Sequence, residues 1–190
     1  MAFYINSKKE ASPERISYFL TKCIQRHCGE WKEIVFLCIG SDRITGDCLG
    51  PYIGQQLLRY PLRGITVYGT LEQPIHALNL DKSIQYIQRK HPHALVIAID
   101  ASLGTKKHLG YVTIGNGSLS PGAGVSKTLS PVGDIYITGI VNTAGFLEHL
   151  TLQTTRLSTV LSLADTILQG ILCSLRPRHF LSAAALEKTR

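Results

Sequence analysis

Apolar residues follow two spacings along the chain, the three- to four-residue spacing of helices and the short continuous runs of buried strands. Helical spacing predicts a first helix from Ser12 to about Arg26, with Pro13 in its first turn. Continuous apolar runs predict three strands, at 34–39, 65–69 and 94–99. Helices are expected between these strands, one behind Pro51 and one starting at Asn79 or Asp81 and ending near Lys90. The order is that of a mostly parallel sheet with right-handed crossovers.

The second half of the chain continues the pattern with less regular spacing. Strand-like runs lie at 110–115 and 135–141, separated by a long loop from about Asn116 to Asp134. Loops of this length inside a compact domain are usually functional or mobile. A final helix is expected over 154–175, with one apolar face for packing across the sheet. The sequence therefore predicts an α/β fold with a mostly parallel, mixed, five-stranded sheet.

Length and composition favour one intracellular domain. The chain has 190 residues, and we expect a single domain over 1–182, because the end at 183–190 looks like a vector-derived tail. The net charge of +7 is scattered, which does not favour nucleic-acid binding. The five cysteines lack paired spacing, which is typical of reduced thiols in a cytoplasm. Because there is no signal-like start and no sufficiently long apolar run, no membrane attachment is expected.

Two aspartates carry the candidate chemistry, because each comes just after an apolar, strand-like run. Asp47 lies in the glycine-rich loop that follows the 34–39 strand, and Asp100 directly follows Ile99. Carboxyl ends of parallel strands gather ligands and catalytic groups at one edge of a sheet. Two carboxyl groups held close together share one proton, so the pair can supply an acid and a base at once. This arrangement favours hydrolysis.

Other interpretations of these residues stay open on spacing alone. Asp47 could cap the helix that begins near Pro51, and Asp100 could merely end its strand in a turn. The segment at 121–128 lacks the glycines of a phosphate loop, so a loop that borders a substrate is the better interpretation. No histidine is marked as a third metal ligand. His108 and His149 could approach the carboxyl groups, whereas His91 and His93 are expected to face solvent.

Three motifs occur together in an order that resembles a known family. They are Gly46-Asp47-Cys48-Leu49-Gly50-Pro51, Ile99-Asp100-Ala101, and Ser120-Pro121-Gly122-Ala123-Gly124-Val125 followed by Ile137-Thr138-Gly139-Ile140-Val141-Asn142. In this the chain resembles the YyaC family of sporulation proteases, which is related to the spore germination protease and more distantly to the hydrogenase maturation endopeptidases. The resemblance implies a three-layer αβα sandwich of the phosphorylase/hydrolase-like kind. It also implies that Asp47 and Asp100 are the catalytic pair of an atypical aspartic endopeptidase.

The resemblance leads to a specific functional hypothesis. We expect an endopeptidase in the cytoplasm of the forespore or mother cell of a sporulating bacterium, acting without a cofactor or metal on protein or peptide substrates such as small acid-soluble spore proteins. The residues expected to contact substrate are Ser41, Asp42, Gly122, Gly124, Lys127 and Asn142. Two alternatives remain: a non-catalytic, peptide-binding sporulation protein, and a metal-dependent hydrolase of the hydrogenase-maturation type. Homo-oligomerisation is left open.

Overall fold

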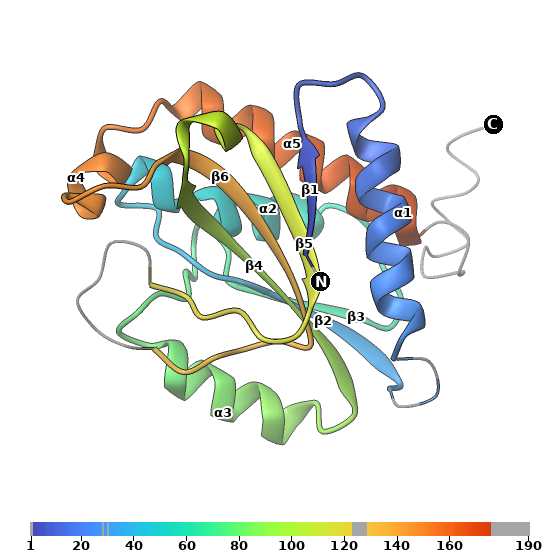
Figure 1. Ribbon diagram of the computed structural model, residues 1–190. Helices are drawn as coiled ribbons and strands as arrows, with labels where there is room; N and C mark the ends of the chain where they lie inside the picture. Colours follow the sequence, from blue (N-terminus) through green and yellow to red (C-terminus); the bar gives the residue numbers. More distant parts are fainter. Residues whose placement is uncertain (1, 28, 30, 123–128, 176–190) are drawn as a thin grey trace.

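A six-stranded mixed sheet forms the centre of the molecule (Figure 1). The computed structural model describes residues 2–27, 29, 31–122 and 129–175. The strand order is β1-β5-β6-β4-β2-β3, in which β3, β2, β4 and β6 run parallel and β5 and β1 run antiparallel to their neighbours. The strands are β1 (Ala2–Asn6), β2 (Glu33–Cys38), β3 (Ile65–Tyr68), β4 (Ala94–Gly104), β5 (Tyr111–Asn116) and β6 (Ile135–Thr143).

Helices cover both faces of this sheet, which makes three layers. The helices are α1 (Ser12–Gln25), α2 (Leu49–Leu57), α3 (Leu80–Lys90), α4 (Glu148–Gln153) and α5 (Leu157–Leu175). In Figure 1, α1, α2 and α5 lie on one side of the sheet and α3 on the other. The sheet separates two hydrophobic cores, one on the side of α1, α2 and α5 and one on the side of α3. Along β2, Phe36 packs into the first core and Leu37 into the second. The predicted α/β fold class is confirmed. The sequence could predict it because a strand that is buried on both faces is apolar throughout.

Three details differ from the expectation. The sheet has a sixth strand, β1, which pairs with β5 and was missed because Ile5 is its only fully buried residue. The helix expected over 154–175 is α5, and the short helix before it, α4, was not predicted. Strand β4 continues through Asp100 to Gly104, because pairing with β6 extends beyond the end of β2. Asp100 therefore lies inside a strand, at the level where the neighbouring β2 has already ended.

Helix α5 is long and apolar enough to cross a membrane by length and composition alone. Its buried residues, from Val160 to Leu175, belong to the core that it shares with α1 and α2. A core helix of this kind passes the same test as a membrane span. Packing of one apolar face against the rest of the domain accounts for the composition of α5.

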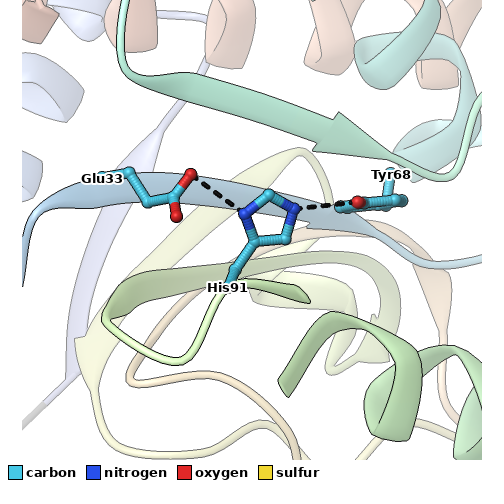
Figure 2. A network of polar contacts seen from close by, with 3 residues as sticks. All are labelled: Glu33, Tyr68 and His91. Atoms are coloured by element: carbon cyan, nitrogen blue, oxygen red, sulfur yellow. Dashed lines mark hydrogen bonds and ion pairs between the residues drawn. The ribbon is translucent and has the colours of Figure 1, made fainter. Parts of the chain in front are cut away.

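His91 is a further correction, because it does not face solvent. Its side chain is 9% exposed and follows the last residue of α3. Nδ1 lies 2.9 Å from a Glu33 carboxylate oxygen, and Nε2 lies 2.9 Å from the Tyr68 hydroxyl (Figure 2). These contacts join the end of α3 to β2 and β3. We call the three residues the His91 network.

Candidate active site

A tight loop after β2 positions Asp47. Gly40 has a φ of 136°, a region that favours glycine, and its N–H donates to the Ile75 carbonyl at 2.8 Å. A Cβ on Gly40 would lie 2.0 Å from the backbone oxygen of Asp47, so the two backbones are in direct contact. The Ser41 N–H donates to that same oxygen at 3.2 Å. The loop thus folds back on itself and holds Asp47 beside the carboxyl end of β2.

Asp47 does not cap the following helix. It is the last residue of the short 3-10 helix η1 (Thr45–Asp47), and the N-cap position of α2 belongs to Cys48, with no side-chain cap hydrogen bond. The capping role that remained open on spacing alone is therefore not observed. The Asp47 carboxyl group is held by a backbone hydrogen bond from Ser41.

Asp100 reaches the same place from the neighbouring strand. The pairing of β2 with β4 ends at Ile99, and the next residue, Asp100, is opposite Thr138 of β6. The Asp100 side chain is 6% exposed, and its Oδ1 accepts a hydrogen bond from the Ala101 N–H at 2.8 Å. A buried carboxyl group with so little hydrogen bonding is unusual and costly when charged.

Both carboxyl groups line one pocket of about 90 Å³. We call it the dyad pocket. Its remaining lining residues come from the ends of several elements and are Ile39, Gly40, Ile44, His76, Ala77, Ala101, Pro121, Gly122, Leu129, His149 and Leu152. The convergence expected from the positions of the two aspartates in sequence is present in the structure. Apolar residues make up much of the wall, which strengthens electrostatic interactions inside it.

Burial gives the two carboxyl groups higher pKa values than ordinary aspartates have. Desolvation raises the pKa of Asp47 to about 6, against the opposing effects of the Ser41 hydrogen bond and the nearby His76 and His149. Desolvation, followed by repulsion from Asp47, raises the pKa of Asp100 well above its usual value, and the Ala101 hydrogen bond only partly opposes this. Between these two titrations Asp47 is ionised while Asp100 keeps its proton. The pair then holds one base and one acid.

Two histidines complete the polar lining of the dyad pocket. His149 lies on α4, as one of the open possibilities had it, and His76 lies in the segment between β3 and α3. Sequence reasoning missed His76. A signal existed, because His76 follows a third parallel strand, and Ile75 forms a parallel bridge to Ile39 beside the loop of Asp47. The rule that located the aspartates also applies there.

The histidines do not by themselves make a metal centre. Within residues 2–27, 29, 31–122 and 129–175, no three His, Cys, Asp or Glu side chains are grouped closely enough to hold a metal ion. A nickel or zinc site needs at least three convergent protein ligands. The donor set among the described residues therefore does not fit such a metal.

The structure brings only some of the expected substrate contacts to the dyad. Gly122 lines the dyad pocket, whereas Gly124 and Lys127 fall outside the described residues. Ser41 and Asp42 line an adjoining pocket of about 450 Å³, which shares Asp47 with the dyad pocket. This second pocket is called the outer pocket below.

Asn142 lies on β6 and is not among the residues that line the dyad pocket. Its side-chain amide donates to the Thr151 carbonyl at 3.2 Å and to the Thr155 hydroxyl at 3.1 Å. Its Oδ1 accepts from the Thr143 N–H at 2.8 Å. These bonds tie the end of β6 to α4, the helix that carries His149, so the geometry assigns Asn142 a positioning role.

The relationship to YyaC expected from the motifs is confirmed by sequence similarity. The chain is 44% identical over 168 residues to the uncharacterized protein YyaC of Bacillus subtilis (strain 168), an alignment that covers 88% of this chain and 81% of that protein. It is also similar to the crystal structure of the [NiFe] hydrogenase maturation protease HycI from Thermococcus kodakarensis KOD1, with 16% identity, a TM-score of 0.46, and coverage of 78% of this chain and 98% of that one. Residues 4–170 match the model of the family described as protein of unknown function DUF1256, and the chain belongs to this family.

Proposed function

We propose that the protein is a metal-independent endopeptidase in which Asp47 and Asp100 activate water. One observation carries the proposal: two carboxyl groups from different elements line one pocket, and burial raises the pKa of both, with repulsion from Asp47 adding to the effect of burial at Asp100. Strongly perturbed acids in a shared pocket are typical of catalytic sites. The resemblance of the motifs around both residues to aspartic endopeptidases supports the same function.

The first step uses the two protonation states together. The Asp47 carboxylate removes a proton from a water molecule, whose oxygen attacks the carbonyl carbon of the scissile peptide. Asp100 gives its proton to the carbonyl oxygen as the C–O double bond opens. The product is a tetrahedral gem-diol, with Asp47 now protonated and Asp100 ionised.

The second step restores the starting state. Asp47 gives its proton to the peptide nitrogen, the C–N bond breaks, and Asp100 takes a proton from one hydroxyl as the new carboxyl group forms. Atoms and protons balance over the two steps, and the net reaction is the addition of one water molecule to one peptide bond. His76 and His149, which lie beside Asp47, stabilise its carboxylate whenever they are protonated.

The substrate class follows from the resemblance and from the site. The outer pocket extends the dyad pocket past Asp42 and is large enough for side chains on one side of the scissile bond. We propose protein or peptide substrates, with small acid-soluble spore proteins as the first to test, in the cytoplasm of the forespore or mother cell.

The decisive experiment compares the wild-type protein with Asp47→Asn and Asp100→Asn. Each purified protein is incubated with spore protein extract and with a random peptide library, and the products are identified by mass spectrometry. We expect cleavage by the wild type alone, while circular dichroism shows that all three proteins are folded. Equal behaviour of the three would contradict the proposal and favour the non-catalytic, peptide-binding alternative.

A metal-dependent hydrolase is the other alternative, and the two histidines beside Asp47 would be its candidate ligands, against the absence of a grouped set of three donors among the described residues. Dialysis against a chelator separates the two mechanisms. An aspartate pair keeps its activity after dialysis, whereas a metal-dependent enzyme loses it and regains it when nickel or zinc is added.

A further inference from the structure

Two further pockets adjoin the dyad pocket in sequence. The outer pocket shares Ile44, Asp47, His76 and Ala77 with the dyad pocket. At its far end the outer pocket shares Glu72 and Pro74 with a third pocket of about 700 Å³. This third pocket, called the β3 groove below, is lined by the end of β3, by α3 and by residues of α2. The three pockets therefore adjoin one another in a row from the two aspartates to β3.

The backbone of β3 is unpaired along this groove. Strand β3 stands at the end of the strand order, and no described strand lies on its outer side. The Ile34 N–H donates to the Gly64 carbonyl at 2.9 Å, so by alternation Thr66 and Tyr68 turn their backbone groups toward β2. Ile65 and Val67 then turn their N–H and C=O groups outward. Such an edge is a template for another extended chain.

A buried hydrogen-bond acceptor also lies in the β3 groove. The Oε1 atom of Gln55 is buried and has no hydrogen-bond partner among the described residues, although Gln55 is one of the residues that line the groove. Helix α2 is pressed against the end of β3 here, because a Cβ on Gly54 would lie 2.1 Å from the Gly69 carbonyl oxygen. A buried acceptor without a donor is costly, and because this oxygen is closed off from solvent, a ligand can supply the donor only once the Gln55 amide turns toward the groove.

A rigid aromatic wall forms the other side of the β3 groove. Tyr68 and Tyr86 pack edge to face with ring centroids 6.1 Å apart, and the Lys90 ammonium lies 5.9 and 5.4 Å from the two rings. The His91 network holds the Tyr68 hydroxyl in place, as Figure 2 shows. Tyr86 nevertheless remains 47% exposed. Tyr86, packed against the hydrogen-bonded Tyr68 and open on one side, is therefore a good binding element, because an aromatic side chain buries a large area on contact.

We propose that an extended segment of the polypeptide substrate binds in the β3 groove as an added strand on β3, donates an N–H to Gln55 and packs against Tyr86. The proposal rests on the proposed peptidase function, because it names where the substrate chain lies beyond the scissile bond. A polypeptide is the occupant that fits, since only a chain with repeating N–H and C=O groups satisfies a strand edge. The β3 groove adjoins the outer pocket, which adjoins the dyad pocket. The bound segment would therefore run along β3 and then past Glu72 to Asp47.

Binding is tested on the full-length double variant Asp47→Asn/Asp100→Asn, which cannot cleave its ligand. A fluorescein-labelled twelve-residue peptide is selected on it from a random library, and its affinity is measured by fluorescence polarisation. Added to this background, Tyr86→Ala and Gln55→Leu are each expected to weaken binding about tenfold. Tyr18→Ala is the matched control, because Tyr18 is 54% exposed on α1 and also carries a lysine, Lys22, over its ring.

A second measurement separates strand addition from simple contact with the tyrosine. The selected peptide is resynthesised with N-methyl groups at single alternate positions, which removes backbone donors and keeps the side chains. Strand addition predicts that one of the two alternating sets loses about tenfold in affinity and that the other set does not. Equal affinities for all methylated peptides would overturn the added strand.

The results for the groove and for the peptidase are distinguishable. If Tyr86→Ala and Gln55→Leu bind like Tyr18→Ala, or if no peptide can be selected, the β3 groove is not the binding site, whatever the wild type cleaves. If the groove variants weaken binding but the wild type cleaves nothing, the groove stands and the peptidase proposal fails. Weaker binding when Tyr86→Ala is added to the double variant, together with a raised KM and an unchanged kcat when Tyr86→Ala is made in the otherwise wild-type protein, supports both.

Discussion

Two polar clusters in this protein, one partly buried and one deeply buried, are built in opposite ways. In the His91 network both ring nitrogens of His91 have a partner at 2.9 Å, and the cluster joins three elements. In the dyad pocket Asp100 is at least as buried, yet its carboxyl group has one backbone donor and faces a second carboxyl group. Satisfied polar groups stabilise a fold, whereas unsatisfied ones destabilise it and are retained where chemistry needs them. The comparison supports the dyad pocket as the site of the proposed function.

The largest expected effect is on cleavage by the dyad variants. Asp100→Asn removes the acid and Asp47→Asn removes the base, and each change is expected to lower kcat by about 10²–10⁴-fold, the usual contribution of a general acid or base. Initial rates on a peptide that the wild type cleaves give the measurement. Cleavage within about twofold of wild type by either folded variant would remove the distinction between the two clusters.

The second effect is the pH dependence of kcat/KM. Because the base must be ionised and the pKa of Asp47 is raised to about 6, activity should fall about tenfold for each pH unit below that value. Activity should fall again at higher pH, when Asp100 loses the proton that burial and Asp47 retain. We expect a bell-shaped pH profile of kcat/KM whose rising limb lies near pH 6. A profile that is flat between pH 4 and 8 would contradict the shared proton.

The third effect is on stability: replacing a buried aspartate of the dyad should raise the free energy of unfolding above that of the wild type. The folded pKa of Asp47 is raised above its unfolded value of 3.8, so its contribution to stability is present below pH 3.8 and is lost as the pH rises through about 6. The difference of about two units corresponds to about 3 kcal/mol. Urea denaturation at pH 4 and pH 7.5 should therefore show Asp47→Asn gaining up to about 3 kcal/mol on wild type at the higher pH. No gain at pH 7.5 would show that Asp47 is not destabilised by burial.

The fourth effect has the opposite sign and concerns the His91 network. His91→Ala leaves the Glu33 carboxylate and the Tyr68 hydroxyl without their partner, which should lower the free energy of unfolding by about 1–3 kcal/mol. His93→Ala is the matched control, because His93 is exposed two residues away. Urea denaturation of both variants at pH 7.5 gives the comparison. Equal stabilities would mean that the network contributes nothing and that its contrast with the dyad pocket fails.

The smallest effect is expected at Asn142. Its amide joins β6 to α4, so Asn142→Ala should cost about 1 kcal/mol of stability. Because α4 carries His149, which lowers the pKa of Asp47, the same change should move the rising limb of the pH profile to higher pH, whereas Thr151→Ser, which keeps the accepting carbonyl, should not. An unchanged limb in both variants would make Asn142 a structural residue only.

Local patterns were sufficient for most of the fold. The strand at β2 and the helices α1 and α3 were predicted within about two residues, because continuous apolar runs and helical spacing each permit one structure. Strand β1 was missed, since a short edge strand with one buried residue has no clear period. The length of β4 was also missed, because its last residues are kept in a strand by β6, which comes much later in the chain.

The candidate site, too, was predicted where local patterns suffice and missed where distant segments decide. Asp47 and Asp100 could be found because each lies beside the end of a parallel strand, where the topology exposes side chains to a shared edge. His76 was overlooked, and His91 was misjudged as solvent-facing, because the environment of each depends on a segment distant in sequence. Gly124 and Lys127 lie outside the described residues, so their substrate contacts stay predictions.

The sequence by itself determined which residues could meet at one edge of the sheet, because apolar periodicity sets the order of strands and helices, and right-handed crossovers then set where the strand ends lie. Only the tertiary structure decided how those residues ionise. A pKa depends on how much water burial removes and on which charges stand nearby, and for Asp47 and Asp100 both come from loops and strands far apart in the chain. The separation of an acid from a base in this pocket is a property of packing.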